Sequence, residues 1–112
     1  MNIVTLAECK DRLSIDFDTK DNEITIMANS IESKLFIGAG INSKQLAEQY
    51  SSKELILNET QKEFVENAYN TSKEYILFKL YLDYYNAHTE LDDRRLTAML
   101  KQLQLVGIYE YS

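Results

Sequence analysis

The sequence predicts an all-α protein, a small bundle of about four helices with one long central helix. Three observations carry this prediction. The 112 residues include no proline and only 3 glycines, whereas sandwiches and barrels use both residue types to turn their many short strands. Apolar residues recur at intervals of three and four, the period of a helix with one buried face. The length fits a single domain, residues 1–112, with one modest core.

The first two helices are predicted from the residues at their ends. Thr5 and Glu8 have the spacing of a capping box, in which each side chain bonds the backbone amide of the other residue, and a helix follows from about Leu6 to Leu13. A second helix begins near Asp18 or Asp21, since an acidic first turn suits the positive end of the helix dipole. Its apolar face and the glycines that end it are Ile24, Met27, Ala28, Ile31, Leu35, Gly38 and Gly40.

Residues 41–59 are predicted to form a variable loop with one or two helical turns. Asn42 or Ser43 is placed to cap a short helix that would run through Gln49, because both side chains accept hydrogen bonds from helix N-terminal amides. The apolar cluster Leu55-Ile56-Leu57 is expected to dock on the core from this irregular segment.

The third helix is predicted to be the longest, from about Glu59 to Asn86. Its second half, Tyr75–Tyr85, is apolar on almost every side and holds four of the 8 tyrosines. A helix of this kind has to be covered all round, and a small chain offers few neighbours. Tyrosine is enriched at protein interfaces, so a subunit interface and an ordinary core are equally compatible with this segment.

A short C-terminal helix is predicted over about Asp92 to Leu105. Gly107 is predicted to stop it, because glycine adopts the left-handed conformation found at helix C-termini without steric strain. Residues 106–112 would then form a flexible tail. The apolar stripe of this helix consists of Leu96, Met99, Leu100 and Leu103.

The charge balance argues against several classes of partner. The chain carries 18 acidic and 12 basic residues, a net charge of −6, whereas nucleic-acid and anionic-membrane binding usually depend on a basic surface. The most apolar stretch, Tyr75–Tyr85, is interrupted by Lys79 and Asp83 and is too short to span a membrane. No signal-peptide pattern opens the sequence. The single cysteine, Cys9, fits a reducing compartment such as the cytoplasm.

No constellation for catalysis or for a cofactor is predicted. The run Asp16-Phe17-Asp18-Thr19 matches the Asp-x-Asp-x-Thr pattern of phosphatases with an aspartate nucleophile, but the series of parallel strands that this chemistry needs is missing. The same acidic segment lacks the glycine and the glutamate of a calcium-binding EF-hand loop. One histidine, His88, and one cysteine do not assemble a zinc site or a Cys-His nucleophile. We therefore expect neither an enzyme nor a bound metal.

The order of the elements resembles the bacteriophage head–tail connector, or adaptor, family. The resemblance is carried by the opening Val4–Asp16, the apolar helix Ile24–Leu35 with its glycine stop, the aromatic segment Tyr75–Asn86 and the closing segment Arg94–Leu103. It covers about residues 1–40 well and residues 75–105 more weakly. The chain departs from the family in having no proline before the long helix and Asn86-Ala87-His88 where an arginine often follows it.

The resemblance implies a structural virion protein and not an enzyme. Such proteins are made in the cytoplasm of the bacterial host and form a ring, dodecameric by family resemblance, beneath the portal vertex of the filled head. The ring extends the DNA channel and links the head to stopper or tail-completion proteins. The partners implied are further copies of the chain, the portal protein and the stopper or tail protein, with DNA only as cargo. A negatively charged lumen would let DNA pass without adhering.

Within this hypothesis we assign roles to two groups of residues. Ring contacts join two different faces of each subunit, and the aromatic part of the long helix is predicted to supply one of them through Tyr75, Phe78, Tyr81, Leu82 and Tyr85. The terminal helix and tail are predicted to contact the portal or the next ring through Arg94, Arg95, Leu103, Ile108, Tyr109 and Tyr111.

Two other functions stay open. Residues 43–58 resemble the start of a helix-turn-helix, which would make the chain a small DNA-binding regulator, although the segment Lys53–Asn58 offers few side chains suited to reading bases. The chain would also suit a generic helical interaction module, such as an antitoxin or a chaperone-like partner. The regulator predicts a dimer and salt-sensitive DNA binding, and the module predicts a one-to-one complex without a ring.

Overall fold

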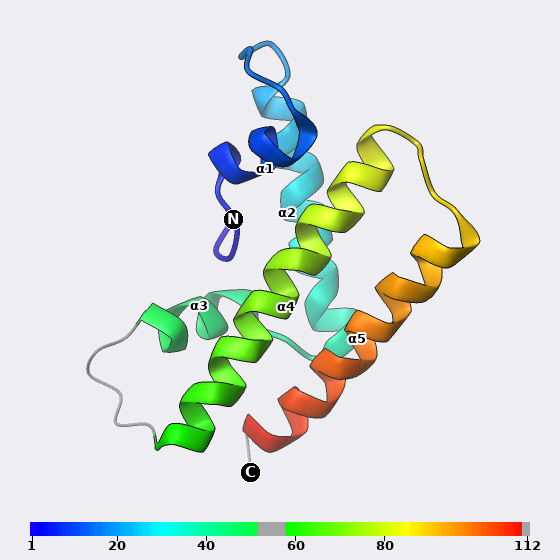
Figure 1. The fold of residues 1–112 in the computed structure, drawn as a ribbon. Helices are drawn as coiled ribbons and strands as arrows, with labels where there is room; N and C mark the ends of the chain where they lie inside the picture. Colours follow the sequence, from blue (N-terminus) through cyan, green and yellow to red (C-terminus); the bar gives the residue numbers. More distant parts are fainter. Residues whose placement is uncertain (52–57, 111–112) are drawn as a thin grey trace.

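The long helix α4 (Glu59–Tyr84) runs through the middle of the molecule and contacts each of the other four helices in the described residues. A computed structural model describes residues 1–51 and 58–110, with side chains up to residue 105. Helix α5 (Glu90–Glu110) lies antiparallel to α4, and α2 (Asp21–Ala39) crosses behind both (Figure 1). The short helices α1 (Leu6–Leu13) and α3 (Ser43–Ser51) pack at opposite ends of α4. The predicted all-α bundle is confirmed.

The ends of the first two helices follow the predicted signals. Thr5 accepts a hydrogen bond from the amide of Glu8, and the Glu8 carboxylate accepts one from the amide of Thr5. Gly40 ends α2 with a φ of 69°, in the left-handed region that glycine enters without strain. Helix α2 begins at Asp21, the second of the two predicted starts.

Several helix boundaries differ from the prediction: α4 ends at Tyr84 and not at Asn86, and α5 begins at Glu90 and not at Asp92. The short helix predicted within the variable loop is present as α3, with Asn42 accepting a hydrogen bond from the Gln45 amide, and it runs to Ser51, two residues past the predicted end at Gln49. Helix α5 does not stop at Gly107 but continues to Glu110. The prediction of a flexible tail over 106–112 is therefore wrong for residues 106–110. One glycine inside a helix costs only about 1 kcal/mol relative to alanine, and no proline follows to enforce a stop. The cluster Leu55-Ile56-Leu57 lies outside the described residues.

One apolar core joins the helices and the N-terminal segment. Ile24 and Leu35 of α2, Ile76 and Leu80 of α4, and Leu103 of α5 are each fully buried in it. Cys9 is also fully buried, and burial together with the nearby Glu8 and Glu32 carboxylates raises the pKa of its thiol to about 11. At neutral pH Cys9 is therefore a protonated core residue.

Candidate interaction surfaces

The aromatic end of α4 is divided between the core and the surface. Tyr75 and Leu82 are buried at 6% and 4% exposure, and Phe78 is partly buried against the core. The prediction that these side chains are exposed is therefore wrong for Tyr75 and Leu82, which belong to the apolar core. Tyr81 and Tyr85 remain exposed, at 43% and 47%.

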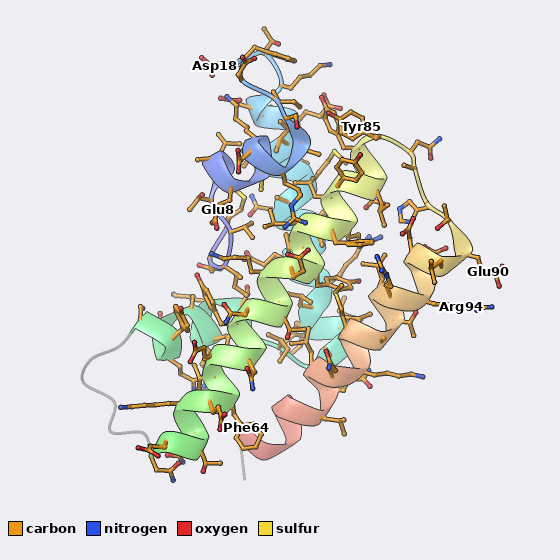
Figure 2. All side chains as sticks on the ribbon, in the orientation of Figure 1. Glu8, Asp18, Phe64, Tyr85, Glu90 and Arg94 are labelled. Carbon is orange, nitrogen blue, oxygen red and sulfur yellow. The ribbon has the colours of Figure 1, made fainter. Side chains whose placement is uncertain are left out.

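The two exposed tyrosines are held differently. The Tyr85 hydroxyl donates a hydrogen bond to the backbone carbonyl of Leu13, which ties the end of α4 to the end of α1. Figure 2 shows Tyr85 at this end of α4, near the segment that follows α1. Its ring also packs edge-on against Tyr84, while Tyr81 is inclined to it at a centroid distance of 5.1 Å. Tyr85 thus has a structural role within its own chain, and Tyr81 is the more available for an outside contact.

A hollow of about 370 Å³ lies beside Tyr81. Its lining comes from four parts of the chain, namely α1, α4, the α4–α5 connection and the first turns of α5, through Arg12, Phe78, Tyr81, Leu82, Ala87 and Asp92. The Arg12 guanidinium makes two hydrogen bonds of 2.9 Å to the Glu74 carboxylate. The arginine charge is therefore already neutralised, and Asp92 is the carboxylate that lines the hollow.

The residues predicted to contact the portal do not form one surface. Leu103 has no exposed area, so its assignment as a partner contact is wrong: it lies on the face of α5 that packs into the core. Arg94 and Arg95 are exposed, and Arg94 forms an ion pair of 2.8 Å with Glu90 on the outer side of α5 (Figure 2). The side chains of Ile108 and Tyr109, and all of Tyr111, lie outside the described residues.

A second apolar surface, which the sequence reasoning missed, lies at the C-terminal end of α2. Phe36 and Ile37 are exposed at 62% and 85%. The next residue, Gly38, accepts a hydrogen bond of 2.7 Å from the Gln104 side chain of α5. Phe36 and Ile37 are apolar but do not lie on the predicted apolar stripe of α2. This departure from the pattern is the sequence feature that indicates their exposure.

A histidine links the two longest helices near the hollow. The ring nitrogens of His88, in the connection, contact Asp83 of α4 and Asp93 of α5. Hydrogen bonds to Asp83 and then to Asp93 raise the pKa of His88 above its ordinary value, because both carboxylates favour the protonated ring. The arrangement is an exposed clamp across the turn between α4 and α5.

This clamp predicts a pH-dependent stability difference between the wild type and His88→Gln. The stabilisation is complete below the unfolded-state pKa of about 6.5 and is lost as the pH rises through the raised folded-state pKa. Thermal unfolding should therefore favour the wild type at acidic pH, by less than about 1 kcal/mol at this exposed site, and the two curves should converge at alkaline pH. The chain has 1 histidine, so a ring-proton NMR titration gives its pKa directly. A value at or below about 6.5 would contradict the clamp.

The part of the chain that the structure describes holds neither a metal-ligand cluster nor a membrane-spanning helix. Within residues 1–51 and 58–110, no three His, Cys, Asp or Glu side chains gather where they could hold a metal ion. None of the described helices combines the length and apolar character needed to cross a membrane.

Helix α3, the first helix of the segment that resembles a helix-turn-helix, packs on α2 and α4. Most of the segment that would form the recognition helix, Lys53–Asn58, lies outside the described residues.

Comparison of the chain with protein-family models, curated proteins and solved structures finds no match. The helical fold is established by the structure itself, and the resemblance to head–tail connectors stays a prediction that rests on the quoted residues.

Proposed function

We propose that this protein is a structural subunit of a phage head–tail connector, which assembles into a ring beneath the portal, extends the DNA channel and links the head to stopper or tail proteins. The role is architectural and not enzymatic, and the site of action is the virion. The observation that carries the proposal is that exposed apolar side chains lie next to one another at two separate places in the described residues, Tyr81 with Tyr85 and Phe36 with Ile37. Exposed apolar side chains grouped in this way mark interaction sites.

The distance between the two surfaces supports a ring over a simple pair. Asp92 lines the hollow beside Tyr81, whereas Gln104 contacts the end of α2 next to Ile37. Twelve residues of helix separate these two positions in α5, or about 18 Å at 1.5 Å per residue. A ring requires each subunit to offer two different surfaces, while a two-fold dimer requires only one self-complementary patch.

The charge of the chain agrees with passage of DNA. A net charge of −6 disfavours strong contacts with phosphates, which suits a channel through which DNA has to slide. The same acidity argues against the alternative of a DNA-binding regulator. The generic interaction module stays an alternative, and it differs from the connector in predicting no ring.

The first test of the proposal is the substitution Tyr81→Asp. A charge placed at an apolar subunit contact has to be desolvated, so we expect this variant to remain monomeric under conditions in which the wild type forms a ring. Its helical circular dichroism should be retained, because Tyr81 is 43% exposed. Sedimentation velocity and circular dichroism give the two readouts.

Tyr81→Phe is the matched control, since it keeps the ring of the side chain and removes only the hydroxyl. It should assemble as the wild type does. Intact rings formed by Tyr81→Asp would refute this part of the surface as a subunit contact. We favour Tyr81 over Tyr85 for this test because Tyr85 also bonds Leu13 within its own subunit.

A further inference from the structure

From the two apolar surfaces we infer the contact that joins neighbouring subunits: Phe36 and Ile37 of one copy insert into the hollow between α1, α4 and α5 of the next. This inference rests on the proposed function and deepens it, because it names the partner as a second copy of the chain and identifies the two surfaces that meet. We call Phe36 and Ile37 the α2 knob.

The sizes of the two surfaces agree. The hollow measures about 370 Å³, and Phe78, Tyr81, Leu82 and Ala87 provide its apolar lining. A closed apolar cavity of about 150 Å³ is already large enough to bind benzene. The hollow therefore has room for a phenyl ring with an aliphatic side chain beside it. Ile37 at 85% exposure and Phe36 at 62% have little of their apolar surface covered within their own subunit.

The charges around the two surfaces are complementary. Lys34 precedes Ile37 by one helical turn, is exposed and makes no ion pair within the described residues. The hollow carries the opposite sign: Asp92 lines it, and Glu74 already neutralises Arg12. An incoming knob would bring the Lys34 ammonium towards a carboxylate rim, which favours the correct orientation of the two copies.

The two surfaces lie too far apart for the α2 knob to enter the hollow of its own chain. About 18 Å of α5 separates the end of α2 from the hollow, and both belong to the same packed core of helices. When the knob of one chain fits the hollow of an identical chain, the contact is head-to-tail. Each further copy is added with the same rotation, and a ring forms when these rotations add up to a full turn. The second copy is thus the occupant that the size, the charge and the placement favour.

The test uses one variant of each surface and then mixes them. Ile37→Glu places a charge on the knob, and Ala87→Arg fills the hollow with a long side chain that also repels Lys34. We expect each variant alone to lose the higher-mass species, with self-association weakened about 10- to 100-fold, since burial of one isoleucine contributes about 1.5–3 kcal/mol. Mixed in equal amounts, the two should form a heterodimer, because one intact knob and one intact hollow remain. Native mass spectrometry measures both.

Two matched controls keep the test specific. Ile26→Glu introduces the same charge on the same helix at a residue that is 60% exposed, and Ala98→Arg makes the same change at an exposed position of α5 that does not line the hollow. Both should assemble as the wild type does, and all four variants should retain helical circular dichroism.

The outcomes separate this contact from the proposed function. A heterodimer on mixing supports the contact, and a wild type of ring mass then supports the connector as well. A wild type that closes as a dimer through the same contact would keep the contact and contradict the connector. A wild-type ring that survives Ile37→Glu, or a mixture that stays monomeric, would overturn the contact and leave the connector standing. A wild type that is monomeric at every concentration would overturn the contact.

Discussion

Leu103→Ala should lower the free energy of unfolding by about 3 kcal/mol, within the range of about 2–5 kcal/mol found for leucine-to-alanine changes in packed cores. Leu103 has no exposed area and lies in the core where α5 packs against α4 and α2. The substitution removes buried methyl groups and leaves a cavity that the surrounding helices only partly refill. Equilibrium urea unfolding, followed by circular dichroism, measures the change.

Leu105→Ala is the matched control for that prediction. Leu105 lies on the same helix two residues further on and is 61% exposed, so its truncation should change the free energy of unfolding by no more than about 0.5 kcal/mol. If the two substitutions had equal effects, Leu103 would not be a core residue. The prediction that Leu103 contacts a partner would then be possible again.

Glu32→Ala should have a comparable effect, a loss of about 2–4 kcal/mol. The Glu32 side chain is buried at 5% exposure in α2, where it accepts hydrogen bonds from the backbone amides of Asn2 and Ile3 at 2.8 to 3.1 Å. A hydrogen bond to a charged group contributes about 1.5–3 kcal/mol, and a buried amide left without an acceptor adds a desolvation penalty. The N-terminal segment, with Ile3 and Val4 buried, should detach first.

Glu32→Gln separates the hydrogen bonds from the size of the side chain. The amide oxygen can still accept from both backbone donors, so we expect a smaller loss than for Glu32→Ala. Hydrogen exchange of the Ile3 amide gives a local readout, which should accelerate strongly in Glu32→Ala and moderately in Glu32→Gln. Unchanged Ile3 protection in Glu32→Ala would show that Glu32 does not hold the N-terminal segment.

Local sequence patterns predicted the start of α1 and the end of α2. Contacts between residues far apart in the sequence could not be predicted from such patterns. The Thr5–Glu8 box and the Gly40 cap depend on residues three or four apart, so their geometry follows from spacing alone. The Arg12–Glu74 pair joins residues 62 positions apart, and no local pattern predicts it. Gly107 illustrates the limit of a single signal, since the helix continues through it.

The contact residues were harder to predict than the fold. The segment Tyr75–Tyr85 is apolar almost all round, so its periodicity does not tell which side faces solvent; Leu82 proved buried and Tyr81 exposed. Glu32 carries a clearer signal in the sequence. It follows Ala28 by four residues and precedes Leu35 by three, which places a carboxylate on the apolar stripe of α2. Such a residue is buried only where donors meet it.

The connector proposal is tested most directly by the native mass of the wild-type protein over a range of concentrations, with negative-stain images of the heaviest species. The proposal predicts a closed ring with a central hole and a mass that is a whole multiple of 13.0 kDa, twelve copies if the family resemblance holds. A discrete dimer that binds DNA at physiological salt would contradict it and favour the helix-turn-helix regulator.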